Sequence, residues 1–147
     1  MLYRKATPSD IDAIVDIAIE SVSNDPLPVK IDLSAMAATA RSCLNPAHFM
    51  WVADHDGKVV AAFAACVQQG FWFHKLQCSV LLYYTRVPGA GTPLMREFAK
   101  WVKSRSAIKL AIIELEPGAD LRLVRFFKRL GFTRESTNLT YVRGIES

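Results

Sequence analysis

The chain has 147 residues, of which 51% are hydrophobic and 22% are charged, a composition that predicts one globular domain and excludes an intrinsically disordered chain. Its longest apolar stretch, residues 59–67, is too short for a membrane-spanning helix of about 20 residues, and its first residues do not resemble a secretory signal peptide, so we expect a cytoplasmic protein. The net charge of +4 is unevenly divided: residues 1–74 hold five Lys or Arg against eight Asp or Glu, whereas residues 75–147 hold thirteen against six.

The first half of the chain is predicted to contain two helices and a hairpin. A short strand over residues 2–6 leads into Thr7-Pro8-Ser9-Asp10, which is typical of a capping box and begins an amphipathic helix. Asn24-Asp25-Pro26-Leu27-Pro28 is expected to end that helix. The other predicted elements are a helix at 33–44 and two strands at 49–53 and 58–67, joined by a turn at 55–57.

The second half alternates strands and helices. A loop over 68–76 is followed by a strand at 77–85, a helix at 92–105 and a strand at 108–116. A strand, a crossover helix and a strand in this order predict a parallel pair. The last predicted elements are a helix at 120–130 and an edge or closing strand at 138–143.

The segment Arg86-Val87-Pro88-Gly89-Ala90-Gly91-Thr92 joins an apolar predicted strand to an amphipathic predicted helix. Glycines let the backbone approach a phosphate closely, and the unpaired N–H groups and positive dipole end of the following helix attract the anion. Thr92 is expected to be the N-cap of this helix and Pro93 its first residue. The basic second half of the chain also suits an anionic ligand, although an ordinary turn and a solvated helix face explain the same residues.

A second motif, Leu123-Val124-Arg125-Phe126-Phe127-Lys128-Arg129-Leu130-Gly131-Phe132, predicts an amphipathic helix ended by Gly131 in the left-handed capping position. With the preceding Arg-x-x-Gly-x-Gly motif, it resembles the GNAT superfamily of acyl-CoA-dependent N-acyltransferases. The Leu-Leu-Tyr-Tyr run at 81–84 and Trp101 further resemble small members of that superfamily encoded by bacteriophages.

The resemblance implies a single GNAT-like acyltransferase domain over residues 1–147, with an α/β (α+β) fold in which helices flank a mostly antiparallel sheet containing a central parallel strand pair. It also implies acetyl-CoA, or another short acyl-CoA, as the acyl donor and direct transfer to a primary amine. A backbone N–H of the strand before the Gly-rich turn would bind the oxyanion, with Leu81, Leu82 and Tyr83 as candidates. The residues implied to contact coenzyme A are Leu82, Tyr83, Arg86, Val87, Gly89, Ala90, Gly91, Thr92 and Phe127.

The side chains that would move protons depart from the family pattern. Phe127 occupies the position of the tyrosine that usually protonates the thiolate, so it lacks the required hydroxyl. Glu114, near the end of a predicted parallel strand, and the strand residues Tyr83 and Tyr84 are the catalytic candidates. The alternative is that Glu114 is simply exposed or salt-bridged and that the tyrosines belong to the core. Glu116 also lies at the end of that predicted strand, and simple exposure or a salt bridge is the alternative explanation for it as well.

The three cysteines, Cys43, Cys66 and Cys78, have neither metal-ligand nor Cys-x-x-Cys spacing. They are expected to be buried free thiols, and no metal site is predicted. His74 as a base and Cys78 as a nucleophile are weaker candidates for catalysis. A lone loop histidine beside Trp72 is more often a surface residue, and Cys78 has no evident activating partner.

The acceptor, a small-molecule or peptide amine, cannot be read from the sequence. Phe71, Trp72 and Phe73 suggest an apolar or aromatic substrate, but a hydrophobic lid or a contact in a homodimer explains them equally well. A GNAT-fold module that binds CoA or a partner without catalysis is the main alternative function. Nucleic-acid binding by the basic half is less favoured, because no aromatic–basic motif of a known reader is present.

Overall fold

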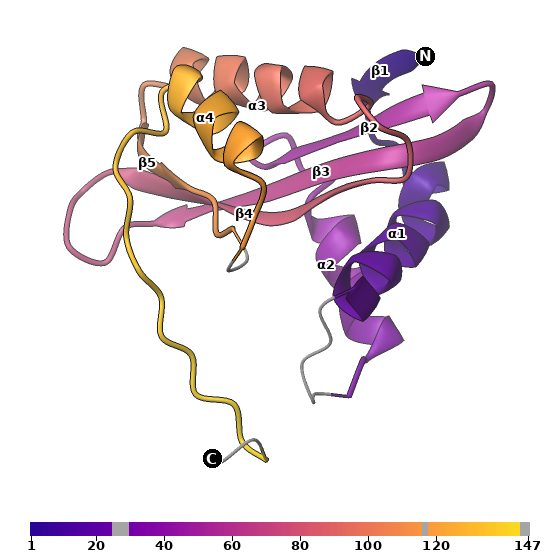
Figure 1. The fold of residues 1–147 in the computed structure, drawn as a ribbon, viewed down its shortest axis with the longest axis horizontal. Helices are drawn as coiled ribbons and strands as arrows, with labels where there is room; N and C mark the ends of the chain where they lie inside the picture. Colours follow the sequence, from indigo (N-terminus) through magenta and orange to yellow (C-terminus); the bar gives the residue numbers. More distant parts are fainter. Residues whose placement is uncertain (25–29, 116–117, 145–147) are drawn as a thin grey trace.

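The computed structural model describes residues 1–24, 30–115 and 118–144, and they form a five-stranded sheet with helices on both faces. The strands follow the chain order across the sheet, β1-β2-β3-β4-β5 (Figure 1). The pairs β1–β2, β2–β3 and β3–β4 are antiparallel. Strands β4 and β5 are parallel, as the order of strand, crossover helix and strand predicted. The strands are β1 (Leu2–Lys5), β2 (Phe49–His55), β3 (Lys58–Gln69), β4 (Leu76–Thr85) and β5 (Ile108–Ile112).

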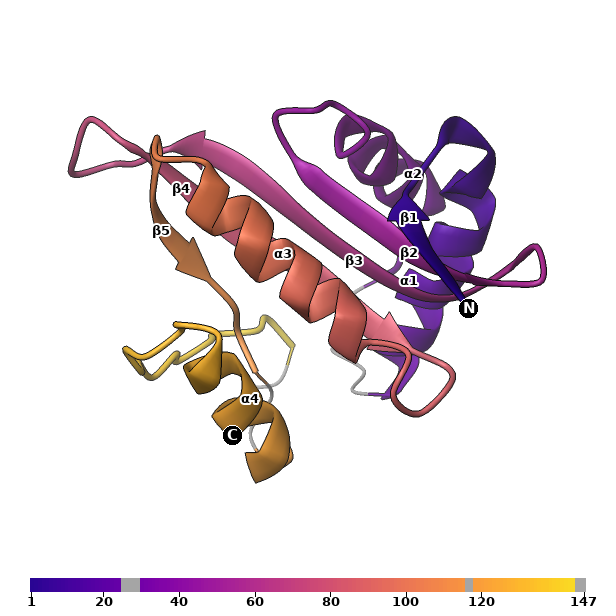
Figure 2. The same ribbon diagram turned by 90° about the horizontal axis from the view of Figure 1, so that it is seen from above.

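Two helices pack on each side of this sheet (Figures 1 and 2). Helices α1 (Ile11–Asn24) and α2 (Leu33–Ser42) cover one face, and α1 follows a short 3-10 turn, η1 (Pro8–Asp10). Helix α3 (Thr92–Ser104) crosses the other face, and α4 (Leu121–Arg129) lies beside it near the β5 edge. Within the described residues, none of the helices has the length and apolar content needed to cross a membrane.

Strand β3 is buried on both faces and divides the core into two clusters. Ala61, Phe63 and Ala65 face α3, where the rings of Phe63 and Phe98 lie 4.7 Å apart. Ala62 and Ala64 alternate with them and face α1 and α2. The alternation follows from the two-residue period of a strand, and the alanines allow both helical layers to approach the sheet closely.

Three local signals are confirmed: the hairpin turn, the capping arrangement before α1 and the glycine that ends α4. Asp56 and Gly57 have φ values of 52° and 85°, as a two-residue hairpin turn between right-twisted strands requires. The backbone N–H of Thr7 donates to the Asp10 carboxylate at 2.8 Å, which completes the predicted capping arrangement before α1. Gly131, at φ 111°, ends α4 in the left-handed region.

Three expectations need correction. Residues 138–143 form no strand: the segment after α4 is extended without a ladder partner, and Leu139 is 94% exposed. Consequently β5 is an edge strand, and the parallel pair lies at the edge of the described sheet instead of its centre. Strand β5 also stops at Ile112, short of the predicted 116. The predicted helix stop at 25–28 and Glu116 lie outside the described residues.

Candidate active site

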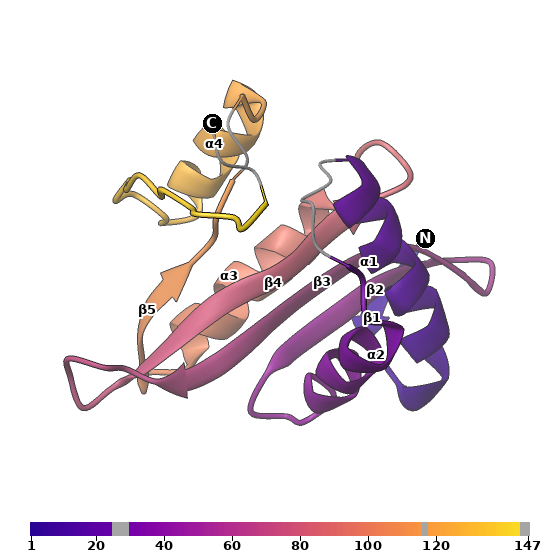
Figure 3. The same cartoon turned by 90° about the horizontal axis from the view of Figure 1, so that it is seen from below.

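Strand β5 pairs along its whole length with the first four residues of β4. Their parallel register runs from Leu76 opposite Ile108 to Ser79 opposite Ile112, and none of the described pairings joins Val80–Thr85 to β5. Figures 1 and 3 show the chain after β5 leading away from β4 toward α4. The backbone edge of β4 is therefore open along its second half, at the carboxyl ends of two parallel strands, where α/β sheets commonly bind ligands.

A β-bulge falls where the two strands separate. Val80 pairs with Ala65 and Leu82 pairs with Ala64, so Leu81 is the extra residue and has no partner on β3. Leu81 is 48% exposed. Leu81 thus has no register partner on β3 and none of the described pairings joins it to β5.

In the Gly-rich loop between β4 and α3, some backbone N–H groups donate hydrogen bonds within the protein and others do not in the described residues. The N–H of Arg86 donates to the Val60 carbonyl at 2.8 Å, and that of Ala90 donates to the Val87 carbonyl at 3.1 Å. In the described residues, by contrast, no hydrogen bond is found from the backbone N–H groups of Gly89, Gly91 and Thr92. Donors of this kind at the N-terminus of a thirteen-residue helix are the groups that commonly bind anions.

The N-cap of α3 is Gly91 and not Thr92 as predicted, so Thr92 and Pro93 are the first two helical residues. The reason is a close tertiary contact. A Cβ built on Gly91 would lie 2.7 Å from Cε1 of Tyr83 and closer still to its hydroxyl oxygen. Only glycine therefore allows the helix start to rest on the Tyr83 ring.

The Arg86 side chain, predicted to hold pyrophosphate, is engaged elsewhere. Its Nε donates to Glu20 of α1 at 2.8 Å, and this hydrogen bond raises the pKa of the guanidinium. The ion pair joins the end of β4 to the helical layer on the opposite side from α3. In this arrangement the guanidinium is directed at Glu20 of α1 and not at the Gly-rich loop.

The candidate proton donors do not lie together. Tyr83 packs with the α3-side core, where its ring meets Phe127 edge-on at 6.4 Å, whereas Tyr84 packs on the α1–α2 side. Burial raises the pKa of the Tyr83 phenol, which keeps it protonated. Phe127 is 2% exposed and packed within the core. Glu114 is exposed beyond the end of β5.

The cysteine prediction is largely confirmed. All three thiols are free, Cys43 and Cys78 are buried, and Cys66 is partly exposed. Burial raises the pKa of Cys78 to about 12, so a nucleophilic thiolate is disfavoured there. Among the described residues, no His, Cys, Asp and Glu side chains gather in a group that could hold a metal ion.

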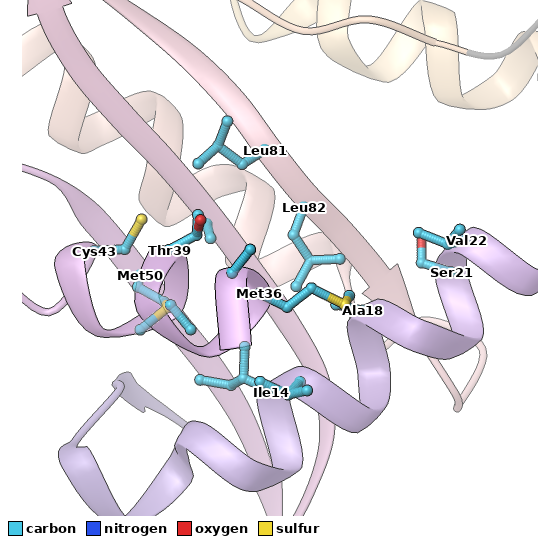
Figure 4. Close-up of a pocket in the computed structure, with 14 residues that line it drawn as sticks. Ile14, Ala18, Ser21, Val22, Met36, Thr39, Cys43, Met50, Leu81 and Leu82 are labelled. Carbon is cyan, nitrogen blue, oxygen red and sulfur yellow. The ribbon is translucent and has the colours of Figure 1, made fainter. Parts of the chain in front are cut away.

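A pocket of about 310 Å³ lies on the other side of the bulge (Figure 4). It is bounded by two helices and three strands, and it reaches Leu81 and Leu82 of β4. The sequence predicted an amphipathic helix here. In the structure Ile14 is buried, and it lines the pocket together with Val15, Ala18 and Val22 of α1 and with Met36 and Thr39 of α2. The width of the α1 stripe and the alanine-rich α2 were the available signals.

Comparison with protein families shows to which family this chain belongs. The model of the acetyltransferase (GNAT) family matches residues 15–132. The chain belongs to the GNAT acetyltransferase family. The GNAT match begins within α1 and ends just after α4, and therefore includes the open edge of β4, the Gly-rich loop and the pocket except for Ile14.

Solved structures share the GNAT fold at low sequence identity. A predicted acetyltransferase with acetyl-CoA from Clostridium acetobutylicum is 20% identical, with a TM-score of 0.74 over 96% of this chain and 95% of that one. The ribosomal-protein-alanine N-acetyltransferase of Brucella melitensis is 20% identical, with a TM-score of 0.73 over 89% and 83%. An aminoglycoside acetyltransferase from an uncultured soil metagenomic sample, in complex with sisomicin, is 13% identical, with a TM-score of 0.67 over 99% and 96%. No curated protein sequence matches the chain.

GNAT enzymes use acetyl-CoA, and the residues present here fit its phosphates. The fit rests on the open N–H groups of Gly89, Gly91 and Thr92. Gly89, at φ 81°, leaves its Cβ position open, so the loop presents backbone to solvent there.

Proposed function

We propose that the protein transfers an acetyl group, or another short acyl group, from acyl-CoA to a primary amine by direct attack. The observation that carries this proposal is the open edge of β4 beside the Gly-rich loop. Beyond Ser79 the strand has no described partner on β5, and the loop that follows the strand offers free N–H groups to a phosphate. One ligand that combines a pyrophosphate with an extended amide-bearing arm satisfies both features.

The donor would be held mainly by backbone groups. The N–H groups of Gly89, Gly91 and Thr92 bind the pyrophosphate at the helix N-terminus, and Leu82 and Tyr83 belong to the strand edge along which the arm lies. Arg86, Val87 and Ala90 shape the loop through their internal hydrogen bonds. Phe127 contributes to the site by supporting the Tyr83 ring from α4.

Leu81 is the residue that we assign to the oxyanion. Its N–H belongs to the bulge, outside both ladders, at the point where β4 becomes open. The amine nitrogen forms a bond to the acyl carbon, the carbonyl oxygen gains negative charge, and the N–H donor stabilises that charge. The C–S bond then breaks, the amine nitrogen loses a proton, and the thiolate gains one.

The proton steps do not require a family tyrosine at position 127. Tyr83 is kept protonated by burial, Tyr84 and Glu114 are the remaining candidates, and water can carry protons between them. Positioning of the two reactants supplies much of the rate in such a reaction. A module that binds acyl-CoA without turnover is the alternative that the missing tyrosine favours.

The test combines donor binding with turnover. A ligand at 100 times its dissociation constant stabilises a protein by about 2.7 kcal/mol, so millimolar acetyl-CoA should raise the melting temperature. Thiol release from acetyl-CoA is then measured against a panel of primary amines. Unchanged melting would overturn acyl-CoA binding, whereas binding without thiol release from any amine would support the non-catalytic module.

A further inference from the structure

The pocket between the helices α1 and α2 and the sheet has an apolar lining. Its described walls are aliphatic and sulfur-containing side chains, with Ser21 and Thr39 as the hydroxyl-bearing residues (Figure 4). The lining residues are Ile14, Val15, Ala18, Ser21, Val22, Ala35, Met36, Thr39, Ala40, Cys43, Met50, Ala64, Leu81 and Leu82.

None of the described lining residues is an Asp, Glu, Lys or Arg, although α1 carries three acidic residues. Asp12 and Asp16 are exposed, and Glu20 pairs with Arg86 at 2.8 Å. Cys43 is the titratable lining group, and burial raises the pKa of its thiol, so it stays neutral. An ammonium group entering this pocket would lose water without gaining a carboxylate partner, which is costly.

The pocket also meets the open edge of β4. Leu81 and Leu82 belong to its wall, and Leu81 is the bulged residue at which β4 has already separated from β5. A molecule filling the pocket from the α1–α2 side therefore reaches the backbone of the strand beside which the acyl group would lie. This contact makes the pocket a subsite for the acceptor, with its reactive end toward Leu81.

We infer that the acceptor is a monoamine with an apolar body, such as an alkylamine or an arylalkylamine, and not a polycation. The inference rests on the proposed acyl transfer and names its second substrate. The apolar body fills the pocket lined by α1 and α2, where it is held by hydrophobic burial. The nitrogen reaches Leu81 in its neutral form, and Thr39 lies at the exposed side of the pocket.

The first experiment uses the complete protein with acetyl-CoA and the straight-chain series from propylamine to hexylamine. Amine basicity is nearly constant along this series, so differences report burial of the chain. Each added methylene should raise kcat/KM about fourfold until the pocket is full. Butane-1,4-diamine and an aminoglycoside, each carrying additional cationic groups, should be used at least tenfold less well than hexylamine.

The second experiment changes the charge of the pocket at an exposed position. Thr39→Glu introduces a carboxylate on α2, and Thr39→Gln is the matched neutral control. Thr39→Glu should reduce the preference for hexylamine over butane-1,4-diamine at least tenfold, whereas Thr39→Gln should leave that preference within twofold. Acetyl-CoA should raise the melting temperature of both variants by the same amount as in the wild-type protein.

Direct binding separates failure of this inference from failure of the proposed function. Hexylamine and butane-1,4-diamine are titrated into the protein without acetyl-CoA, and binding is followed by chemical-shift changes of residues lining the pocket. If acetyl-CoA does not bind, or if no amine is turned over, the proposed acyltransferase function is overturned. Binding of hexylamine would in that case still support an apolar ligand for the pocket. Equal or better binding and turnover of the diamine would overturn the apolar acceptor even if the enzyme is active.

Discussion

The two faces of the sheet offer opposite chemistry to a ligand. On the α3–α4 side the charged side chains of the helices are mostly basic, and no hydrogen bond is found from several backbone N–H groups of the Gly-rich loop in the described residues. On the α1–α2 side, α1 carries acidic residues and no Lys or Arg, and the pocket is lined by uncharged, mainly apolar side chains. The two faces meet at Leu81 of β4.

This difference shows how one strand can serve two unlike substrates. Phosphates are bound by backbone dipoles and positive charge, which need little side-chain specificity, whereas an apolar acceptor is selected by burial. Since successive residues of a strand face opposite sides, β4 can contact both ligands without mixing their environments. The bulge at Leu81 interrupts that alternation at the point where the ligands would meet.

The largest effect should come from removing the donor at the junction of the two faces. Leu81→Pro deletes one backbone N–H, and proline is tolerated in bulges better than elsewhere in a strand. We expect kcat to fall about 10²- to 10³-fold, as for loss of one oxyanion donor, with acetyl-CoA binding retained. Leu81→Ala is the control and should keep most turnover. If a folded Leu81→Pro variant keeps the wild-type kcat, the Leu81 N–H does not bind the oxyanion, and another N–H, such as that of Leu82 or Tyr83, would have this role.

The packing of the Gly-rich loop gives the next effect. Gly91→Ala places a methyl group against the Tyr83 ring and should destabilise the protein by about 2 to 3 kcal/mol in urea unfolding. Gly89→Ala meets no neighbour, and its positive φ should cost only about 1 kcal/mol. The double variant Gly91→Ala/Tyr83→Leu tests the cause, because removing the ring should make the two changes non-additive. Additive free energies would disprove the clash.

A charge cluster on the α1 side should affect stability without affecting the donor. Asp10 is 5% exposed and accepts hydrogen bonds from Arg4 at 2.7 and 3.0 Å. Asp10→Asn should cost about 1 to 2 kcal/mol at neutral pH and leave acetyl-CoA affinity unchanged.

The pH dependence of that difference follows from the ion pair. The hydrogen bonds from Arg4 lower the pKa of Asp10 in the folded state. The stabilisation is therefore fully present above the ordinary aspartate value of about 4 and is lost as the pH falls through the lower folded-state pKa. The unfolding free energies of the wild-type protein and Asp10→Asn should converge in that acid range; a constant difference would show that the effect comes from packing.

The smallest effect concerns the basic side chains on the α3–α4 side of the sheet. Dephospho-CoA should bind less tightly than CoA at low salt, by less than about 1 kcal/mol, because the basic side chains of α3 and α4 are mostly exposed. Added salt should remove the difference, since exposed charges are screened over about 8 Å at physiological ionic strength. Titration calorimetry at two salt concentrations measures both. Equal affinities at low salt would mean that this face does not contact the 3′-phosphate.

The sequence by itself determined the order of elements, the hairpin turn, the cap at Gly131, the parallel pairing and the family. These features depend on local propensity, on residue periodicity and on short motifs, which are visible in a linear chain. It also placed an anion site in the Gly-rich loop, which the open N–H groups support. The strand predicted at 138–143 failed because a strand needs a ladder partner, which no local pattern can supply.

Only the tertiary structure decided which groups face the site. Arg86 belongs to a motif that implied phosphate binding, yet its side chain pairs with Glu20, a residue far away in sequence. Gly91 is required because Tyr83 lies beneath it, and the bulge at Leu81 arises from register with β3. The apolar pocket is lined by residues of α1, α2 and three strands, which only the fold brings together. Contacts between distant segments fix all four features, so they follow from packing and not from any local sequence pattern.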